Sequence, residues 1–140
     1  IVISFFGKEC MNSYKDLVVW QKAIDLTIEI YSLTNLFPKE EMYGLVSQIR
    51  RSAVSIPSNI AEGQARKYHQ QFSHFLSIAQ GSLAELETQI IIAIKLGYIA
   101  GEQKDLFDMM HSIGKMITRL KQNLTQEEKK ILDTRETIDQ

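Results

Sequence analysis

The chain has 140 residues, of which 44% are hydrophobic and 24% charged, so it is large enough for one globular domain with its own core. Its net charge of −1 excludes a global electrostatic attraction to nucleic acid or to an anionic membrane, and any such binding must use a local patch. A single cysteine, Cys10, excludes an internal disulfide and a cysteine-based zinc site, and it fits a reducing, cytoplasmic setting.

Residues 1–10, IVISFFGKEC, precede Met11 and lie outside the helical pattern. Their apolar run is shorter than the roughly 7–15 residues of a signal-peptide core, and we interpret them as a non-native or disordered extension. The alternative is an apolar arm that pairs with another chain. No stretch approaches the roughly 20 apolar residues of a membrane span, so we expect no membrane association. We predict a bundle over residues 11–125 and a helical extension or frayed tail over 126–140.

Apolar residues at steps of three and four predict four helices, over residues 16–36, 40–65, 69–96 and 102–123. The first has two apolar stripes, one formed by Leu17, Trp20, Ile24, Ile28 and Tyr31 and the other by Val19, Ala23, Leu26, Ile30 and Leu33. Each of the other three has a single stripe. Gly97 follows the third helix at the position where a glycine commonly ends a helix.

No segment alternates with a period of two residues, which argues against β-strands. Four long helices with short connections predict an all-α, single-domain, antiparallel up-down four-helix bundle. The sequence from Thr125 to Glu128 has the form of a capping box, so it either begins a short terminal helix or lies within a continuing one. We expect residues 133–140 to be frayed.

The segment over residues 43–63 is the least ordinary part of the chain, because it combines a helical pattern with an internal proline, Pro57. A proline inside a helix removes one hydrogen bond and costs roughly 3 kcal/mol. Small residues crowd the same segment, and we hypothesise that a kink near Pro57 fits a subunit contact. The candidate oligomer-contact residues are Ser55, Pro57, Ser58, Ala61, Glu62 and Gly63.

Basic residues gather in two places on the predicted helices, and arginine forks suit phosphate groups. The candidate nucleic-acid-binding residues are Arg50, Arg51, Arg66, Lys67, Lys115 and Arg119. The alternative is that these are solvated basic faces, or that they form ion pairs with Glu40, Glu41 and Glu62. Tyr68 is the one tyrosine that we consider for base stacking, while Tyr31 and Tyr43 are expected to pack in the core or at helix ends.

The residue pattern gives little support to an enzyme. The three histidines, His69, His74 and His111, lack the spacing of a zinc or di-iron site. The serines of the second helix have no histidine base in the pattern, and a catalytic pair formed by Glu85 and Glu87 is poorly supported. We therefore expect neither catalysis nor a cofactor nor a bound metal.

Four segments together resemble a known family: DLVVWQKA at 16–23, IYSLTNLFPKEEMYGLVSQIRRSAVSIPSNIAEG at 30–63, FLSIAQGSLAELETQI at 75–90 and LGYI at 96–99. They are similar to the four-helix-bundle family of 23S ribosomal RNA intervening-sequence proteins, over about residues 14–124. The resemblance implies a left-handed up-down bundle that assembles as a homopentamer, although the role of most members is unknown.

A related branch of that family is the accessory variability protein of diversity-generating retroelements, which is a basic pentameric barrel that binds nucleic acid and a reverse transcriptase. This chain departs from that branch in charge, with a pI of about 6.3. The leading hypothesis is a non-enzymatic oligomeric protein that binds RNA. The alternatives are a protein-interaction scaffold without nucleic-acid binding and, third, an enzyme.

Overall fold

The computed structural model describes residues 13–140 and contains four long helices and no strand among these residues. The long helices are α1 (Val18–Thr34), α2 (Leu45–Ala65), α3 (His69–Lys95) and α4 (Lys104–Ile138). Two short 3-10 helices, η3 (Tyr14–Asp16) and η4 (Lys39–Glu41), precede α1 and α2. The prediction of an all-α fold with four helices is confirmed, while the predictions for residues 1–10 lie outside the described residues.

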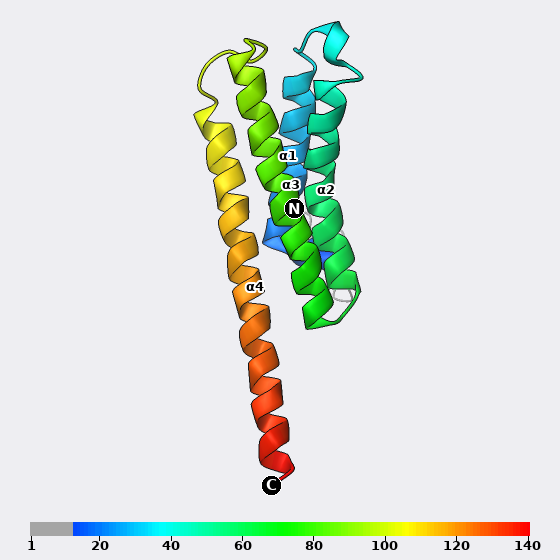
Figure 1. The fold of residues 1–140 in the computed structure, drawn as a ribbon, viewed down its shortest axis with the longest axis vertical. Helices are drawn as coiled ribbons and strands as arrows, with labels where there is room; N and C mark the ends of the chain where they lie inside the picture. Colours follow the sequence, from blue (N-terminus) through cyan, green and yellow to red (C-terminus); the bar gives the residue numbers. More distant parts are fainter. Residues whose placement is uncertain (1–12) are drawn as a thin grey trace.

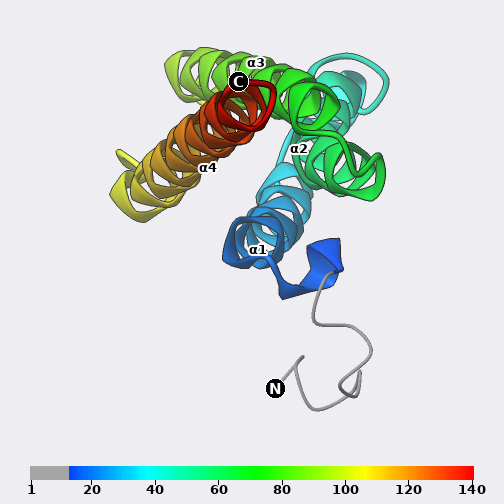
Figure 2. The same ribbon diagram turned by 90° about the horizontal axis from the view of Figure 1, so that it is seen from below.

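The four helices enclose a single core. Helix α2 packs against α1 and α3, and α4 packs against α3 and α1, so each helix has two neighbours (Figure 2). The connections from α1 to α2 and from α3 to α4 lie at one end of the molecule, and the short turn from α2 to α3 lies at the other (Figure 1).

Only one of the two apolar stripes of α1 forms the core. Val19, Ala23, Leu26 and Ile30 are buried, whereas Ile28, from the other stripe, is 63% exposed. The core continues through the predicted stripes of α2 and α3, which include Ile49, Ala53, Ile56, Ile60, Leu76, Ala79, Leu86 and Ile90. The sequence pattern therefore located the apolar faces correctly, and packing decided which face of α1 was buried.

Pro57 lies inside α2 without interrupting it. Its ring nitrogen cannot donate to the carbonyl of Ala53 one turn earlier, which would leave that buried acceptor without its helical partner. The hydroxyl of Thr27 on α1 lies 3.2 Å from this carbonyl oxygen and 2.8 Å from the carbonyl oxygen of Ala23. A side chain of α1 thus replaces the hydrogen bond that the proline removes.

The contact between α2 and α3 depends on small residues. Gly63 is buried, and a Cβ atom added to it would lie 2.7 Å from Cβ of Phe75 and 2.9 Å from Cδ2 of Phe72. Farther along the same contact, the hydroxyls of Ser55 and Ser82 form a hydrogen bond of 2.8 Å. The predicted crowding of small residues on α2 therefore serves close packing against α3 inside one chain.

Helix α3 ends as expected at Gly97, which has a φ of +80°. The amide of Gly97 donates to the carbonyl of Ile94, and the amide of Tyr98 donates to the carbonyl of Ala93, each at 3.0 Å. These two bonds satisfy carbonyls that would otherwise be unpaired at the end of the helix. They also fix the direction of Tyr98, whose hydroxyl donates to Oε1 of Glu41 at 3.3 Å.

Helix α4 is longer than the sequence pattern predicted. The apolar pattern ends near residue 123, but the helix continues to Ile138, so the capping-box sequence at Thr125 lies within a continuing helix, which was one of the two expected alternatives. The expected fraying of residues 133–140 was wrong as far as Ile138. No glycine or proline follows Gly114, so nothing in the sequence stops the helix. Leu124 is its last buried residue, and the following part extends past the other three helices (Figure 1).

Candidate nucleic-acid interface

The first candidate surface is a groove of about 630 Å³ along α1, α2 and the segment that joins them, which we call the α1–α2 groove. It is lined by Tyr31, Met42, Tyr43, Val46, Ser47, Arg50, Arg51, Val54 and Ser55. The adjacent residues Arg50 and Arg51 therefore border the same open surface. The groove combines two cations with two tyrosines.

Arg50 is held firmly in this groove by neutral groups. Its Nε donates to Oγ1 of Thr34 at 2.9 Å, and its Nη2 donates to Oδ1 of Asn35 at 3.0 Å. The guanidinium carbon also lies 4.6 Å from the ring centre of Tyr31, which is within cation–π range. No carboxylate of residues 13–140 forms an ion pair with Arg50, so its charge is positioned without being neutralised.

Arg51 and Tyr43 complete the exposed part of the groove. Arg51 is exposed, and within the described part of the chain it forms no ion pair. Tyr43 is 97% exposed, so the expectation that it would pack in the core or at a helix end was wrong. Tyr31 is 40% exposed and packs against Arg50 near the end of α1. Tyr43 precedes α2, where no neighbouring helix covers it. Helical spacing could not have revealed this face, because Tyr43 lies before the first residue of α2, Leu45.

Two further nucleic-acid-binding candidates, Arg66 and Lys67, lie at the turn between α2 and α3. Arg66 forms an ion pair of 2.9 Å with Glu62 one helical turn earlier, and its guanidinium lies 5.3 Å from the ring centre of Phe75. Lys67 is exposed and has a φ of 63°, an uncommon left-handed conformation for a residue other than glycine. The charge of Arg66 is thus already balanced locally, unlike that of Arg50.

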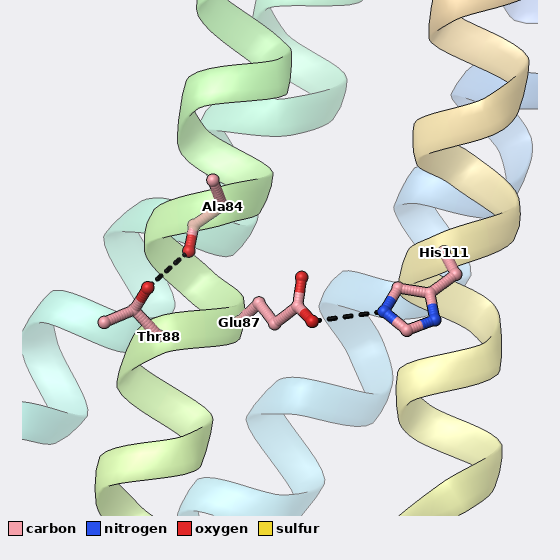
Figure 3. A network of polar contacts seen from close by, with 4 residues as sticks. All are labelled: Ala84, Glu87, Thr88 and His111. Carbon is pink, nitrogen blue, oxygen red and sulfur yellow. Dashed lines mark hydrogen bonds and ion pairs between the residues drawn. The ribbon is translucent and has the colours of Figure 1, made fainter.

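Lys115 and Arg119 lie on a different surface, a groove of about 640 Å³ between α3 and α4 that we call the α3–α4 groove. Its lining includes Leu83 and Met110, together with Glu87 of α3 and His111 of α4, whose Oε1 and Nε2 atoms lie 3.1 Å apart (Figure 3). Neither basic residue forms an ion pair with a described carboxylate. The six nucleic-acid candidates therefore occupy three separate places rather than one continuous patch.

The candidate oligomer-contact residues are also divided. Pro57 and Gly63 are buried within the chain, and Ser55 is hydrogen-bonded to Ser82 of α3. Two others, Ser58 and Ala61, border a smaller groove beside Trp20 of α1. Glu62 is exposed and pairs with Arg66. Packing inside one chain accounts for the buried members of this set, and a subunit contact stays a prediction for the set as a whole.

The described residues contain no cluster of three histidine, cysteine or carboxylate side chains that could hold a metal ion. Ser55 and Ser82 bond to each other and not to a histidine. The carboxylate of Glu85 contacts the amide of Gln89 at 3.4 Å, and Glu87 contacts His111. None of the helices in residues 13–140 combines the length and the apolar character that crossing a bilayer requires.

A comparison with curated proteins found no match to this chain. A comparison with protein-family models matched residues 15–119 to the 23S rRNA-intervening sequence protein family. The matched part covers more than half of the chain and includes α1, α2, α3 and the first half of α4. On this evidence, the chain belongs to the 23S rRNA-intervening sequence protein family.

Proposed function

We propose that this protein is a non-enzymatic, oligomeric helical bundle that binds RNA through the α1–α2 groove. The observation that carries the proposal is the environment of Arg50, whose guanidinium is fixed by Thr34, Asn35 and Tyr31 but is paired with no described carboxylate. A fixed, unneutralised arginine suits phosphate, because the planar fork donates two parallel hydrogen bonds and little side-chain entropy is lost on binding.

The tyrosines of the groove support single-stranded rather than double-stranded RNA. Proteins that bind single strands combine basic side chains with exposed aromatic rings on which bases stack. Tyr43 is almost fully exposed beside Arg50 and Arg51, so a base could stack on its ring while a neighbouring phosphate lies between the two guanidinium groups. This arrangement requires no sequence-specific contact.

We further propose the antiparallel up-down arrangement and the homopentamer that the family resemblance implies, in a cytoplasmic setting. Because a net charge of −1 per chain provides no global attraction to RNA, a single groove should bind RNA only weakly. Repetition of the groove around a ring would raise the overall affinity, because later contacts form at a high effective concentration. Lys115 and Arg119 in the α3–α4 groove would then serve as secondary phosphate contacts.

The test is binding of a labelled single-stranded RNA over a salt series, on protein whose oligomeric mass has been measured. Arg51→Gln should weaken binding and reduce the salt dependence by about 0.7 in the logarithmic slope for each phosphate that the variant no longer binds. Tyr43→Ala should weaken binding by about 1–3 kcal/mol through loss of stacking. Arg66→Gln is the matched control, because Glu62 already balances its charge, and it should have a smaller effect.

Absence of binding at low salt by an intact oligomer would refute the RNA proposal. Equal effects of Arg51→Gln and Arg66→Gln would instead refute the assignment of the groove.

A protein-interaction scaffold is the second candidate, and it is favoured by the apolar side chains exposed in the same groove, since Met42 is 47% and Val54 41% exposed. In that case a photo-crosslinker at position 43 should capture a protein and no RNA.

A further inference from the structure

Two polar bridges cross from α3 to α4 along the α3–α4 groove. The side-chain amide of Gln80 donates to Oγ1 of Thr118 at 2.9 Å and accepts from Nζ of Lys121 at 3.2 Å. The second bridge joins Glu87 to His111 at 3.1 Å (Figure 3). The bridging residues Gln80 and Glu87 are seven apart on α3, as are His111 and Thr118 on α4, so the bridges stand about 10 Å apart along the groove.

The smallest side chains of the lining lie between the two bridges. Ala84 on α3 and Gly114 on α4 are each near the middle between the bridging residues of their own helix. Leu83 lies beside Gly114, since a Cβ atom added to that glycine would be 3.4 Å from Cδ2 of Leu83. Leu83 and Met110 are the buried apolar members of the lining. The groove therefore has an apolar stretch with polar groups at both ends, and its volume of about 640 Å³ is in the range of small-molecule sites.

The charged side chains of the groove favour an anionic ligand. Lys115 and Arg119, one helical turn apart, line it and form no ion pair with a described carboxylate. Glu87 is the one carboxylate among the described residues of the lining, and it is engaged in the second bridge. Asp108 borders a neighbouring pocket with the same two cations, but its carboxylate lies 3.9 Å from Nζ of Lys104.

We propose that the stretch between the two bridges binds a free nucleoside monophosphate. A base has apolar faces and a polar edge, which match the apolar stretch and the polar groups at its ends. The phosphate would lie against Lys115 and Arg119, because an arginine fork donates two parallel hydrogen bonds to phosphate oxygens and a lysine adds a point charge. The bridges bound the stretch at both ends, which suits one base rather than a continuing strand.

The bridging groups keep hydrogen-bonding capacity for the edge of a base. Glu87 uses Oε1 in its bridge, so Oε2 can accept from an amino group. Gln80 donates to Thr118 with one of its two amide hydrogens, so the second can donate to a ring nitrogen or a carbonyl. A bound nucleotide would occupy Lys115 and Arg119 and leave the α1–α2 groove free, so the site does not depend on RNA binding at that groove.

The test is a saturation-transfer-difference NMR titration of the full chain with AMP, a method that detects weak ligands whatever the mass of the oligomer. Adenosine, which lacks the phosphate, is the comparison ligand. AMP should bind, with the base protons receiving more saturation than the ribose protons. Adenosine should bind about tenfold more weakly or less, because Lys115 and Arg119 have no phosphate to hold.

Two variants separate the apolar stretch from the cations. Ala84→Leu should abolish AMP binding by filling the stretch, and it should fold normally because Ala84 is exposed. Arg119→Gln should weaken AMP about tenfold and leave adenosine unchanged. The matched controls are Ser77→Leu, seven residues before Ala84 and outside the lining, and Arg51→Gln in the other groove. Both controls should bind AMP as wild type does, and circular dichroism should show equal helix content throughout.

Three results would overturn the proposal: no AMP binding by the folded protein, equal affinity for AMP and adenosine, or equal effects of Ala84→Leu and Ser77→Leu. A single-stranded RNA oligonucleotide separates a free nucleotide from a strand. RNA binding that Ala84→Leu weakens, without any binding of AMP, would assign the stretch to RNA and also overturn the proposal. RNA binding at the α1–α2 groove is judged separately, by Arg51→Gln and Tyr43→Ala.

Discussion

Replacement of Thr27 by valine removes the hydroxyl that lies 3.2 Å from the carbonyl oxygen of Ala53 and leaves a side chain of nearly the same shape. A hydrogen bond contributes about 0.5–1.5 kcal/mol, and a buried acceptor left without a partner costs about 1–3 kcal/mol. The hydroxyl proton is shared with the carbonyl of Ala23 at 2.8 Å, which places the expected loss for Thr27→Val at about 1–2 kcal/mol.

A stronger prediction concerns Thr27 and Pro57 as a pair. In a Pro57→Ala background the new amide can donate to Ala53, so the same Thr27→Val change should then cost about 0.5 kcal/mol or less. The double-mutant cycle should therefore give a coupling of about 1 kcal/mol between two residues on different helices. The assay is urea unfolding followed by circular dichroism at one fixed protein concentration.

Thr88→Val is the matched control for this cycle. Thr88 is exposed, and its hydroxyl donates only to the carbonyl of Ala84 in its own helix, at 2.8 Å (Figure 3). Its replacement should change stability by no more than about 0.5 kcal/mol. An equal cost of Thr27→Val with and without Pro57 would refute the idea that Thr27 compensates for the proline.

Two further changes test the packing and the titration of the fold. Gly63→Ala should destabilise the protein by about 1–3 kcal/mol, because the added Cβ would meet Phe75. Gly81→Ala should stabilise it by about 0.5–1 kcal/mol, because the added Cβ meets no atom within 4 Å. Thermal unfolding of the two variants measures both changes in stability. Burial and the nearby carboxylate of Glu41 raise the pKa of Tyr98 above its usual 10.0. The neutral form of Tyr98 therefore stabilises the fold below pH 10, and this stabilisation is lost as the pH rises through the raised pKa of the folded state. Tyr98→Phe should flatten the alkaline decline in the free energy of unfolding, and an unchanged decline would exclude Tyr98 as its source.

The sequence was sufficient to predict the helices because their signals are local. Apolar spacing predicted four of them, and Gly97 predicted the end of α3. The length of α4 was left between two alternatives, because the apolar stripe ends near residue 123 and a capping-box pattern follows it without a stop signal. Periodicity also could not choose between the two stripes of α1, since both satisfy the same spacing and only the positions of α2 and α4 decide which is buried.

The candidate site was less predictable, because its properties depend on contacts between segments distant in sequence. The adjacent arginines were evident, but the hydrogen bonds of Arg50 to Thr34 and Asn35 join the beginning of α2 to the end of α1. The exposure of Tyr43 depends on which side of the joining segment faces solvent. Charge spacing likewise could not show that Arg66 is paired while Arg51 is not.

The hydrogen bond between Ser55 and Ser82 has a consequence for folding accuracy. Apolar residues alone specify the alignment of two helices weakly, because cores that keep only hydrophobicity and volume lose a unique arrangement before they lose stability. The two hydroxyls satisfy each other only when α2 and α3 are correctly aligned, and a slip of one turn would separate them. This polar pair therefore contributes more to the alignment of the two helices than to the free energy of their contact. Replacement of both serines by alanine should loosen the alignment more than it lowers the stability of the protein.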